Sequence, residues 1–254
     1  MLNYGRNNVM PAWGAPGGGP LTEQQIEYLI RYMRRIQIPE SELRDIVDTG
    51  VREGIAEHLG VAADDPVVDE WLGAVDSAVE EARSMALAAD QSLAGSPEGI
   101  RRAGLELLAS GQTPGSELYR TYGEILFNNA AAGGTYSCAR CHTYGWSFDA
   151  TTDGDDSIDG HAGPILQSYN VGGGFFGPNL TGGSTLDQFE TAALHSDFIS
   201  AGQTIGQTYG RGGSGGNGQM PGFGPRTDDD LEITYPATLT QDQIDAIVAF
   251  ERNL

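Results

Sequence analysis

The chain has 254 residues, 39% of them hydrophobic, and its 35 acidic side chains against 14 lysines and arginines give a formal net charge of −21. This length and apolar content suit one large or two modest folded domains and exclude a disordered chain. The negative charge argues against nucleic acid and anionic membrane surfaces as partners. The chain also contains no apolar run of about 18 residues, so we expect no membrane span within it.

Capping residues and apolar spacing predict mainly helices. In chain order, we expect helices at 22–33, 40–59, 66–94 and 97–110, one within 112–148 that leads into a cysteine pair, one near 185–195 and one at 241–253. Proline lies at or near the first turn of the second, third and fourth of these, where it is favoured. The rest of 149–254 is glycine-rich. The fold class is therefore predicted to be all-α with long loops.

Two stretches of the chain share an order of features. The run from Tyr4 to a helix start at Thr22 contains a Tyr-Gly-Arg triplet, a Met-Pro pair, a loop rich in glycine and proline, and a Leu-Thr cap. The run from Tyr209 to a helix start at Thr240 contains the same features in the same order. In both, a Gln three residues after the Thr completes a capping box. This internal repeat indicates that residues 1–37 repeat the end of a domain whose full copy spans 112–254.

The motif with the clearest chemistry is Cys138-Ala139-Arg140-Cys141-His142. CxxCH is the attachment pattern of a c-type haem, in which two thiols add to the haem vinyl groups and the histidine binds the iron. A thioredoxin-like dithiol is an alternative, although no βαβ pattern surrounds the motif. A zinc site is another, with His161 or His195 as a fourth ligand, although no second cysteine pair exists.

A haem iron held by His142 needs a ligand on its other side. Met220 lies among glycines just before the last helix, which is an unusual place for a core methionine. A thioether opposite histidine is the ligand pair of small electron carriers, and it raises the reduction potential. His161 and His195 are the rival ligands. For His195, on a predicted helix, we expect a capping or surface role.

Together these residues resemble class I cytochrome c over about 112–254. By that resemblance, Gly123 and Phe127 belong to a first helix that crosses the last one. The Gly-Pro-Asn-Leu segment at 177–180 implies that the Pro178 carbonyl accepts a hydrogen bond from His142, a contact that orients metal-binding histidines. The resemblance implies one covalent haem c, bound by Cys138, Cys141, His142, Pro178 and Met220, with His142 and Met220 as the iron ligands.

The chain departs from the family by insertions. The gap between His142 and Pro178 is 36 positions and contains an acidic loop at 149–159. Clustered aspartates can bind calcium, but the spacing is not that of an EF-hand, and a solvated loop is the simpler interpretation.

The resemblance divides the chain into a C-terminal remnant of a first cytochrome c-like domain at 1–37, a helical spacer at 38–111 and the haem domain at 112–254. Met10 then matches the distal ligand of a second haem whose CxxCH is missing. A truncated dihaem protein explains this, as does a degenerate first domain that never held haem. The lack of a signal peptide at residues 1–6 favours truncation, because c-type haem is attached after export.

The implied function is electron transfer, not catalysis, in a respiratory chain outside the cytoplasm. The expected location is the periplasm or the outer face of the cytoplasmic membrane, with a missing segment as the place of any anchor. A quinol-oxidising complex and a terminal oxidase are the expected redox partners. The alternative is a cytochrome domain that serves as electron outlet of a larger dehydrogenase or reductase.

Overall fold

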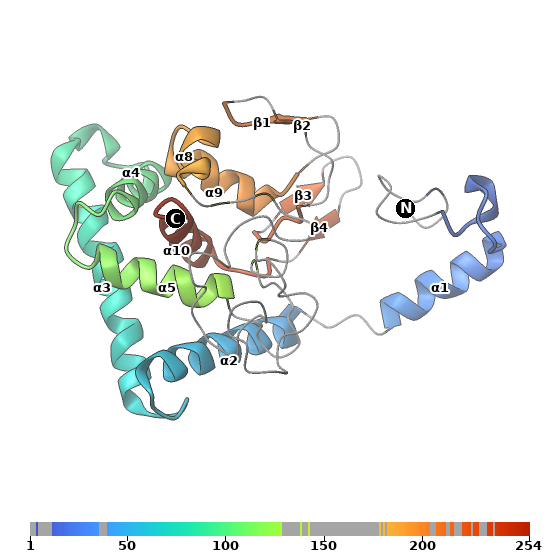
Figure 1. Ribbon diagram of the computed structural model, residues 1–254, viewed down its shortest axis with the longest axis horizontal. Helices are drawn as coiled ribbons and strands as arrows, with labels where there is room; N and C mark the ends of the chain where they lie inside the picture. The colour runs from blue at the N-terminus through green and yellow to red at the C-terminus, as the bar shows by residue number, and fades with distance from the viewer. Residues whose placement is uncertain are drawn as a thin grey trace.

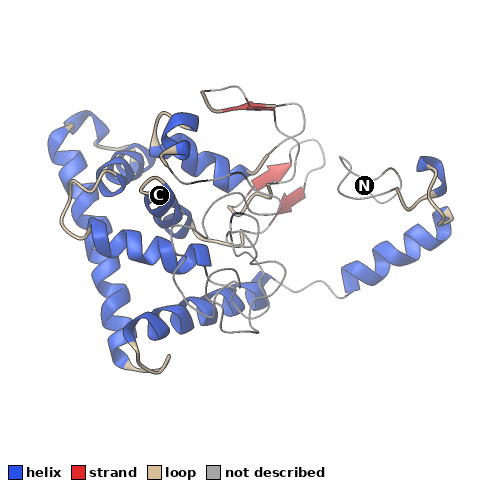
Figure 2. Ribbon diagram, viewed as in Figure 1, coloured by secondary structure: helices blue, strands red, loops and turns tan. Residues whose placement is uncertain are grey.

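The structure is a computed structural model that describes residue 4 and residues 12–35, 40–128, 138, 142, 178, 180, 182–203, 207–211, 214–215, 220–224, 226–228, 233–235 and 237–254. These residues are mostly helical, which confirms the all-α class (Figure 1, Figure 2). The helices are α1 (Glu23–Arg35), α2 (Glu40–Leu59), α3 (Pro66–Ala89), α4 (Pro97–Ala109), α5 (Ser116–Asn128), α8 (Ser184–Gln188), α9 (Ala192–Ala201) and α10 (Gln241–Glu251).

The other regular elements are short. The described residues include single 3-10 turns at Ala15–Gly17 and Gln91–Leu93. Two antiparallel ladders pair β1 (Thr208–Tyr209) with β2 (Ser214–Gly215), and β3 (Arg226–Asp228) with β4 (Ile233–Tyr235).

The helices begin where local capping chemistry predicts. Asp65 caps α3 by accepting a 3.0 Å hydrogen bond from the amide of Val67. Ser96 caps α4 in the same way, at 3.2 Å from the amide of Gly99, and a proline follows each cap. The α3 helix ends at Ala89 instead of 94, because Asp90 leaves the helical conformation and its side chain accepts a hydrogen bond from Ser92 at 2.9 Å.

The two helix starts of the internal repeat have the same cap. At α10, the Gln243 side chain accepts a bond from the Thr240 amide at 2.9 Å, and the Thr240 hydroxyl accepts one from the Gln243 amide at 3.2 Å. At α1, Thr22 and Gln25 make the corresponding pair of bonds at 2.9 and 3.3 Å. Both predicted capping boxes are therefore confirmed.

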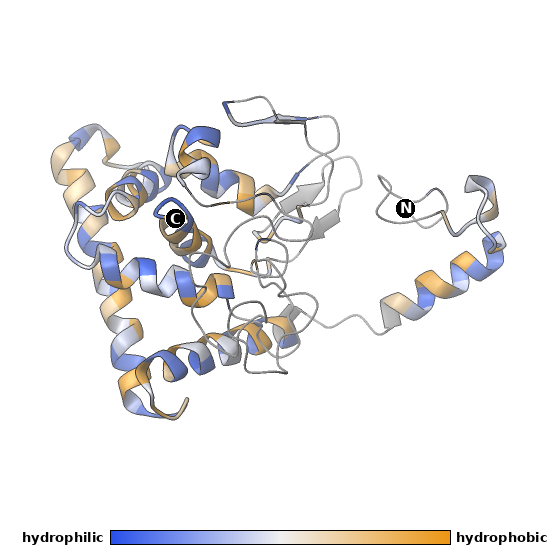
Figure 3. Cartoon of the chain, in the orientation of Figure 1, coloured by the Kyte–Doolittle hydropathy of each residue, from blue (hydrophilic) through white to orange (hydrophobic). Residues whose placement is uncertain are grey.

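Beyond the shared cap, α1 and α10 differ in how much of each helix is buried. From Gln243 to Glu251 every residue of α10 is buried. The α1 helix stands apart from the other helices, and Tyr28 and Tyr32 are 57% and 62% exposed (Figure 1). Hydrophobic residues recur along α1 between hydrophilic ones (Figure 3).

The core is built around the crossing of α5 and α10. Gly123 lies against the backbone of Ala246, and a Cβ added at Gly123 would overlap the Ala246 carbonyl oxygen. One helical turn farther on, the rings of Phe127 and Phe250 pack with centroids 5.3 Å apart. The resemblance predicts this crossing of the first and last helices at Gly123 and Phe127.

Helices α2, α3 and α4 complete the same core. Val47 and Val51 of α2, Val75 of α3 and Leu105 of α4 belong to one buried cluster with Ile244 of α10. The description of residues 38–111 as a spacer between domains stays a prediction. Within the described residues, these helices are packed directly on α5, α9 and α10.

Among the described residues, no helix is both long enough and apolar enough to cross a membrane.

Candidate functional site

The first part of the candidate site is one helical turn. The amide of His142 donates to the carbonyl oxygen of Cys138 at 3.1 Å, which is the hydrogen bond of an α-helical turn. Both residues are buried, with Cys138 at 5% and His142 at 6% exposure. Cys141 lies outside the described residues. The turn therefore presents a thiol and an imidazole from one short segment to the protein interior.

The second part is a contact between two segments 36 positions apart. The Nδ1 atom of His142 lies 3.0 Å from the carbonyl oxygen of Pro178. Because a carbonyl oxygen can only accept, Nδ1 carries the proton, and Nε2 is the ring nitrogen with a lone pair for a metal. The predicted contact is present, and it fixes both the orientation and the tautomer of the imidazole.

The third part is the segment that carries Met220. Met220 is half-buried and packs against the main core, which also includes Cys138 and Phe223. Its carbonyl oxygen accepts a 2.9 Å hydrogen bond from the amide of Gln203, just after α9. The methionine is thus attached to the folded core at its backbone. Its place as an iron ligand stays a prediction.

His195 is buried and paired with an acidic side chain, so the expectation of a capping or surface role is wrong. Its side chain is 3% exposed, and Nε2 lies 2.9 Å from the Glu251 carboxylate, whose side chain is 5% exposed. The ring stacks on Phe189 with centroids 4.7 Å apart. The predicted helix at 185–195 is two helices, because Thr191 starts α9 by accepting a hydrogen bond from the Leu194 amide at 3.1 Å.

Other candidates from the sequence fall outside the described residues. These are His161, Met10 and the acidic loop at 149–159.

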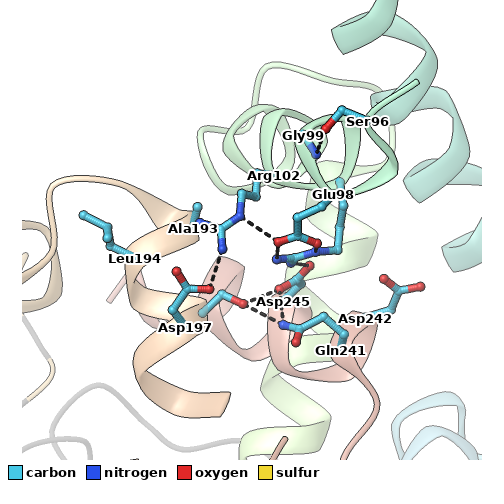
Figure 4. Close-up of polar contacts among 12 residues, drawn as sticks. Ser96, Glu98, Gly99, Arg102, Ala193, Leu194, Asp197, Gln241, Asp242 and Asp245 are labelled. Carbon is cyan, nitrogen blue, oxygen red and sulfur yellow. Dashed lines mark hydrogen bonds and ion pairs between the residues drawn. The ribbon is translucent and has the colours of Figure 1, made fainter. Parts of the chain in front are cut away.

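A buried ionic cluster between α4, α9 and α10 was not predicted. Asp245 on α10, with its side chain 4% exposed, pairs with Arg101 on α4. The other carboxylate oxygen accepts bonds from Ser196 at 2.6 Å and from Gln241 at 3.1 Å (Figure 4). Burial raises the pKa of Asp245, while the hydrogen bonds from Ser196 and Arg101 and the charge of Arg101 oppose that shift. The one sequence signal is a carboxylate inside an otherwise apolar helical stripe.

Three further contacts join α3 and α4 to α9 and α10. Arg102 of α4 pairs with Asp197 of α9 at 2.8 Å (Figure 4). Glu106 accepts a 3.0 Å bond from the amide of Ala193, at the start of α9. Arg83 of α3 pairs with Asp242 of α10 at 2.6 Å. Helices α3 and α4 therefore hold α9 and α10, the two helices that flank the Met220 segment in sequence.

The chain was compared with protein-family models, curated proteins and solved structures, and none of these comparisons gave a match. Any function proposed for it rests on its own residues and their contacts.

Proposed function

We propose that this chain is an electron-transfer protein of the class I cytochrome c type, with one haem c bound covalently through Cys138 and Cys141. His142 and Met220 would be the two iron ligands. The observation that carries the proposal is the 3.0 Å contact between His142 Nδ1 and the Pro178 carbonyl. It joins the CxxCH motif to the Gly-Pro-Asn-Leu segment. By the resemblance to class I cytochrome c, that segment supplies the carbonyl that accepts a hydrogen bond from the iron-binding histidine.

The surroundings of His142 suit a haem ligand. Since Nδ1 is bound to Pro178, the imidazole presents Nε2, and a ring held in this way is a better ligand than a freely rotating one. Cys138 and His142 are both buried, as residues that bind a buried cofactor must be. The close crossing at Gly123 and Ala246 supports the same family resemblance.

The redox chemistry of the proposed site would come from its haem. A c-type haem, when bound, supplies one-electron exchange at its iron. The Met220 thioether would favour the reduced state and raise the potential, as it does in small electron carriers. Because His142 and Met220 would both hold the iron in this proposal, no place would be left on it for a substrate, and the proposed role is electron carriage.

The charge of the chain bears on its partners. A net charge of −21 favours docking to basic surfaces, and such docking weakens as salt screens the charges. A quinol-oxidising complex and a terminal oxidase, outside the cytoplasm, are the partners we propose.

Expression with cytochrome c maturation machinery tests the proposal. We expect a mass increase equal to one haem that survives denaturation, and a pyridine haemochrome of the c type. Cys138→Ala with Cys141→Ala should abolish the covalent adduct. Purified wild-type protein with no adduct under conditions that mature a control cytochrome would refute the proposal.

The distal ligand is tested separately. Met220→Ala should remove the weak near-infrared absorption of methionine-ligated ferric haem and lower the reduction potential. Met85→Ala is the matched control, because Met85 is 39% exposed on α3, and it should leave both properties unchanged.

A further inference from the structure

The segment that carries Met220 is bound to the end of α9 along its whole described length. Three backbone hydrogen bonds join residues 220–224 to residues 199–203. The Gln203 amide donates to the Met220 carbonyl at 2.9 Å, and the Phe223 and Gly224 amides donate to the carbonyls of Ile199 and Ser200 at 3.1 and 3.0 Å. The carbonyls at the end of a helix have no partner within it, so the last turn of α9 offers acceptors at this position.

The other side of the segment is also held. The amides of Thr238 and Leu239, just before α10, both donate to the carbonyl of Phe223, at 2.9 and 3.0 Å. Phe223 is buried, and Leu239 is fully buried. The segment therefore lies between the end of α9 and the start of α10, with its backbone fixed to both.

This arrangement requires glycine on both sides of the contact. Gly202 has φ +72°, and a Cβ there would overlap the backbone of Pro221 and Gly222. A Cβ at Gly222 would lie 2.6 Å from the Ala201 carbonyl oxygen, and one at Gly224 would overlap the hydroxyl of Ser200. Real Cβ atoms essentially never come this close to another heavy atom. At Gly202 and Gly222 the close atoms are backbone, so a side chain would push the two segments apart. At Gly224 a side chain would meet both the hydroxyl and the Cβ of Ser200.

From these contacts we infer that the C-terminal end of α9 is the positioning element for Met220. Ser200 and Gly202 on one side, with Gly222 and Gly224 on the other, are positioning residues that fix where the methionine backbone lies. The inference rests on the proposed haem function, in which Met220 is the distal ligand. It adds that the ligand depends on a glycine-lined contact with a helix that precedes it by about twenty residues.

The test is a pair of substitutions across the contact. Gly224→Ala should displace the segment from α9, so that the holoprotein loses the near-infrared band and its reduction potential falls, while the haemochrome spectrum stays of the c type. Adding Ser200→Gly to Gly224→Ala should restore the position of the segment. With the Ser200 side chain gone, the nearest Ser200 atom to the new Cβ is the Cα, at 3.1 Å. The double variant should therefore regain the band, and Ser200→Gly alone should keep it.

Amide hydrogen exchange of the holoprotein gives a second measurement. Protection of the Phe223 and Gly224 amides should fall in Gly224→Ala and return in the double variant, since these amides bond to α9. A Gly224→Ala protein that keeps the full near-infrared band and potential overturns the inference. So does a double variant that stays without the band, even where Gly224→Ala alone fails to fold.

The two proposals fail in different ways. A wild-type protein with covalent haem and no near-infrared band overturns the assignment of Met220 itself, and with it this inference. If only the inference about α9 is wrong, the wild-type protein has the near-infrared band, and Gly224→Ala keeps the same band and reduction potential.

Discussion

Gly123 on α5 and Ala246 on α10 approach so closely that no Cβ fits between them. A side chain at Gly123 would overlap the Ala246 carbonyl oxygen and stand 3.0 Å from the Cβ of Phe250. This contact sets the distance between the two helices at the centre of the core. It also brings the Phe127 and Phe250 rings together one turn away.

We expect Gly123→Ala to lower the free energy of unfolding by about 3 kcal/mol, because two buried helices must separate to admit the methyl group. Urea unfolding followed by circular dichroism measures this. Gly73→Ala is the control, since nothing lies within 4 Å of a Cβ at that exposed position on α3. There alanine should stabilise the helix by up to about 1 kcal/mol. Equal unfolding midpoints for the two variants would contradict the close packing.

Arg101→Met should cost about 3 kcal/mol, because Asp245 is left as a buried charge without its cation. Asp245→Asn in the Arg101→Met background should recover part of that loss. Since burial raises the pKa of Asp245, the folded single variant holds its proton more tightly than the unfolded chain. Its stability should therefore fall as pH rises through the ordinary aspartate range and on to the folded pKa.

The same substitution at a surface pair is the control. Arg52 pairs with Asp69 at 2.5 Å, but the two side chains are 33% and 68% exposed. Arg52→Met should lower the free energy of unfolding much less than Arg101→Met does, because solvent screens this exposed pair. If the two methionine variants lost equal stability, the buried cluster would have no special role.

The Glu98 carboxylate should make a measurable, pH-dependent contribution to the free energy of unfolding. Hydrogen bonds from Arg101 and Arg102 lower its pKa from 4.5 to about 2, against the opposing effect of burial. A lowered carboxylate pKa gives stability that is complete above pH 4.5 and is lost as pH falls to about 2. Because the side chain is 58% exposed, the contribution should stay below about 1 kcal/mol.

Glu98→Gln should therefore be less stable than the wild type at pH 7, and the two should converge near pH 2. Thermal unfolding at a series of pH values measures the difference. A difference that is constant across the whole pH range would show that the carboxylate charge is not its cause.

His195→Ala separates a structural histidine from an iron ligand. The substitution leaves the Glu251 carboxylate buried without its partner, so we expect a loss of about 3 kcal/mol in unfolding free energy. The near-infrared band of the holoprotein should remain, in contrast to Met220→Ala. A band that is lost in His195→Ala and kept in Met220→Ala would reverse the ligand assignment.

The features that the sequence predicts well are local. The caps at Thr22, Asp65, Ser96 and Thr240 depend on atoms within three residues of each other, so a short stretch of sequence contains the whole interaction. The contact of His142 with Pro178 was predictable only through the family resemblance, because the two residues are 36 positions apart and no local signal links them.

What the sequence did not predict depends on distant partners. His195 is 56 positions from Glu251, and Arg101 is 144 positions from Asp245. A lone polar residue on an amphipathic helix looks the same in the sequence whether it faces water or a buried partner. The sequence therefore predicts a capping or surface role for His195. The break at Thr191 was missed because the apolar pattern continues across it.

The contacts of α3 and α4 with α9 and α10 determine how this protein could be divided. A fragment that begins at residue 112 would leave Asp245 without Arg101 and the amide of Ala193 without Glu106, and would expose the apolar faces of α5 and α10 to water. We therefore expect the smallest autonomous folding unit to start at α2. A chain cut between α4 and α5 should be recovered as an aggregate, whereas one cut before Glu40 should refold alone.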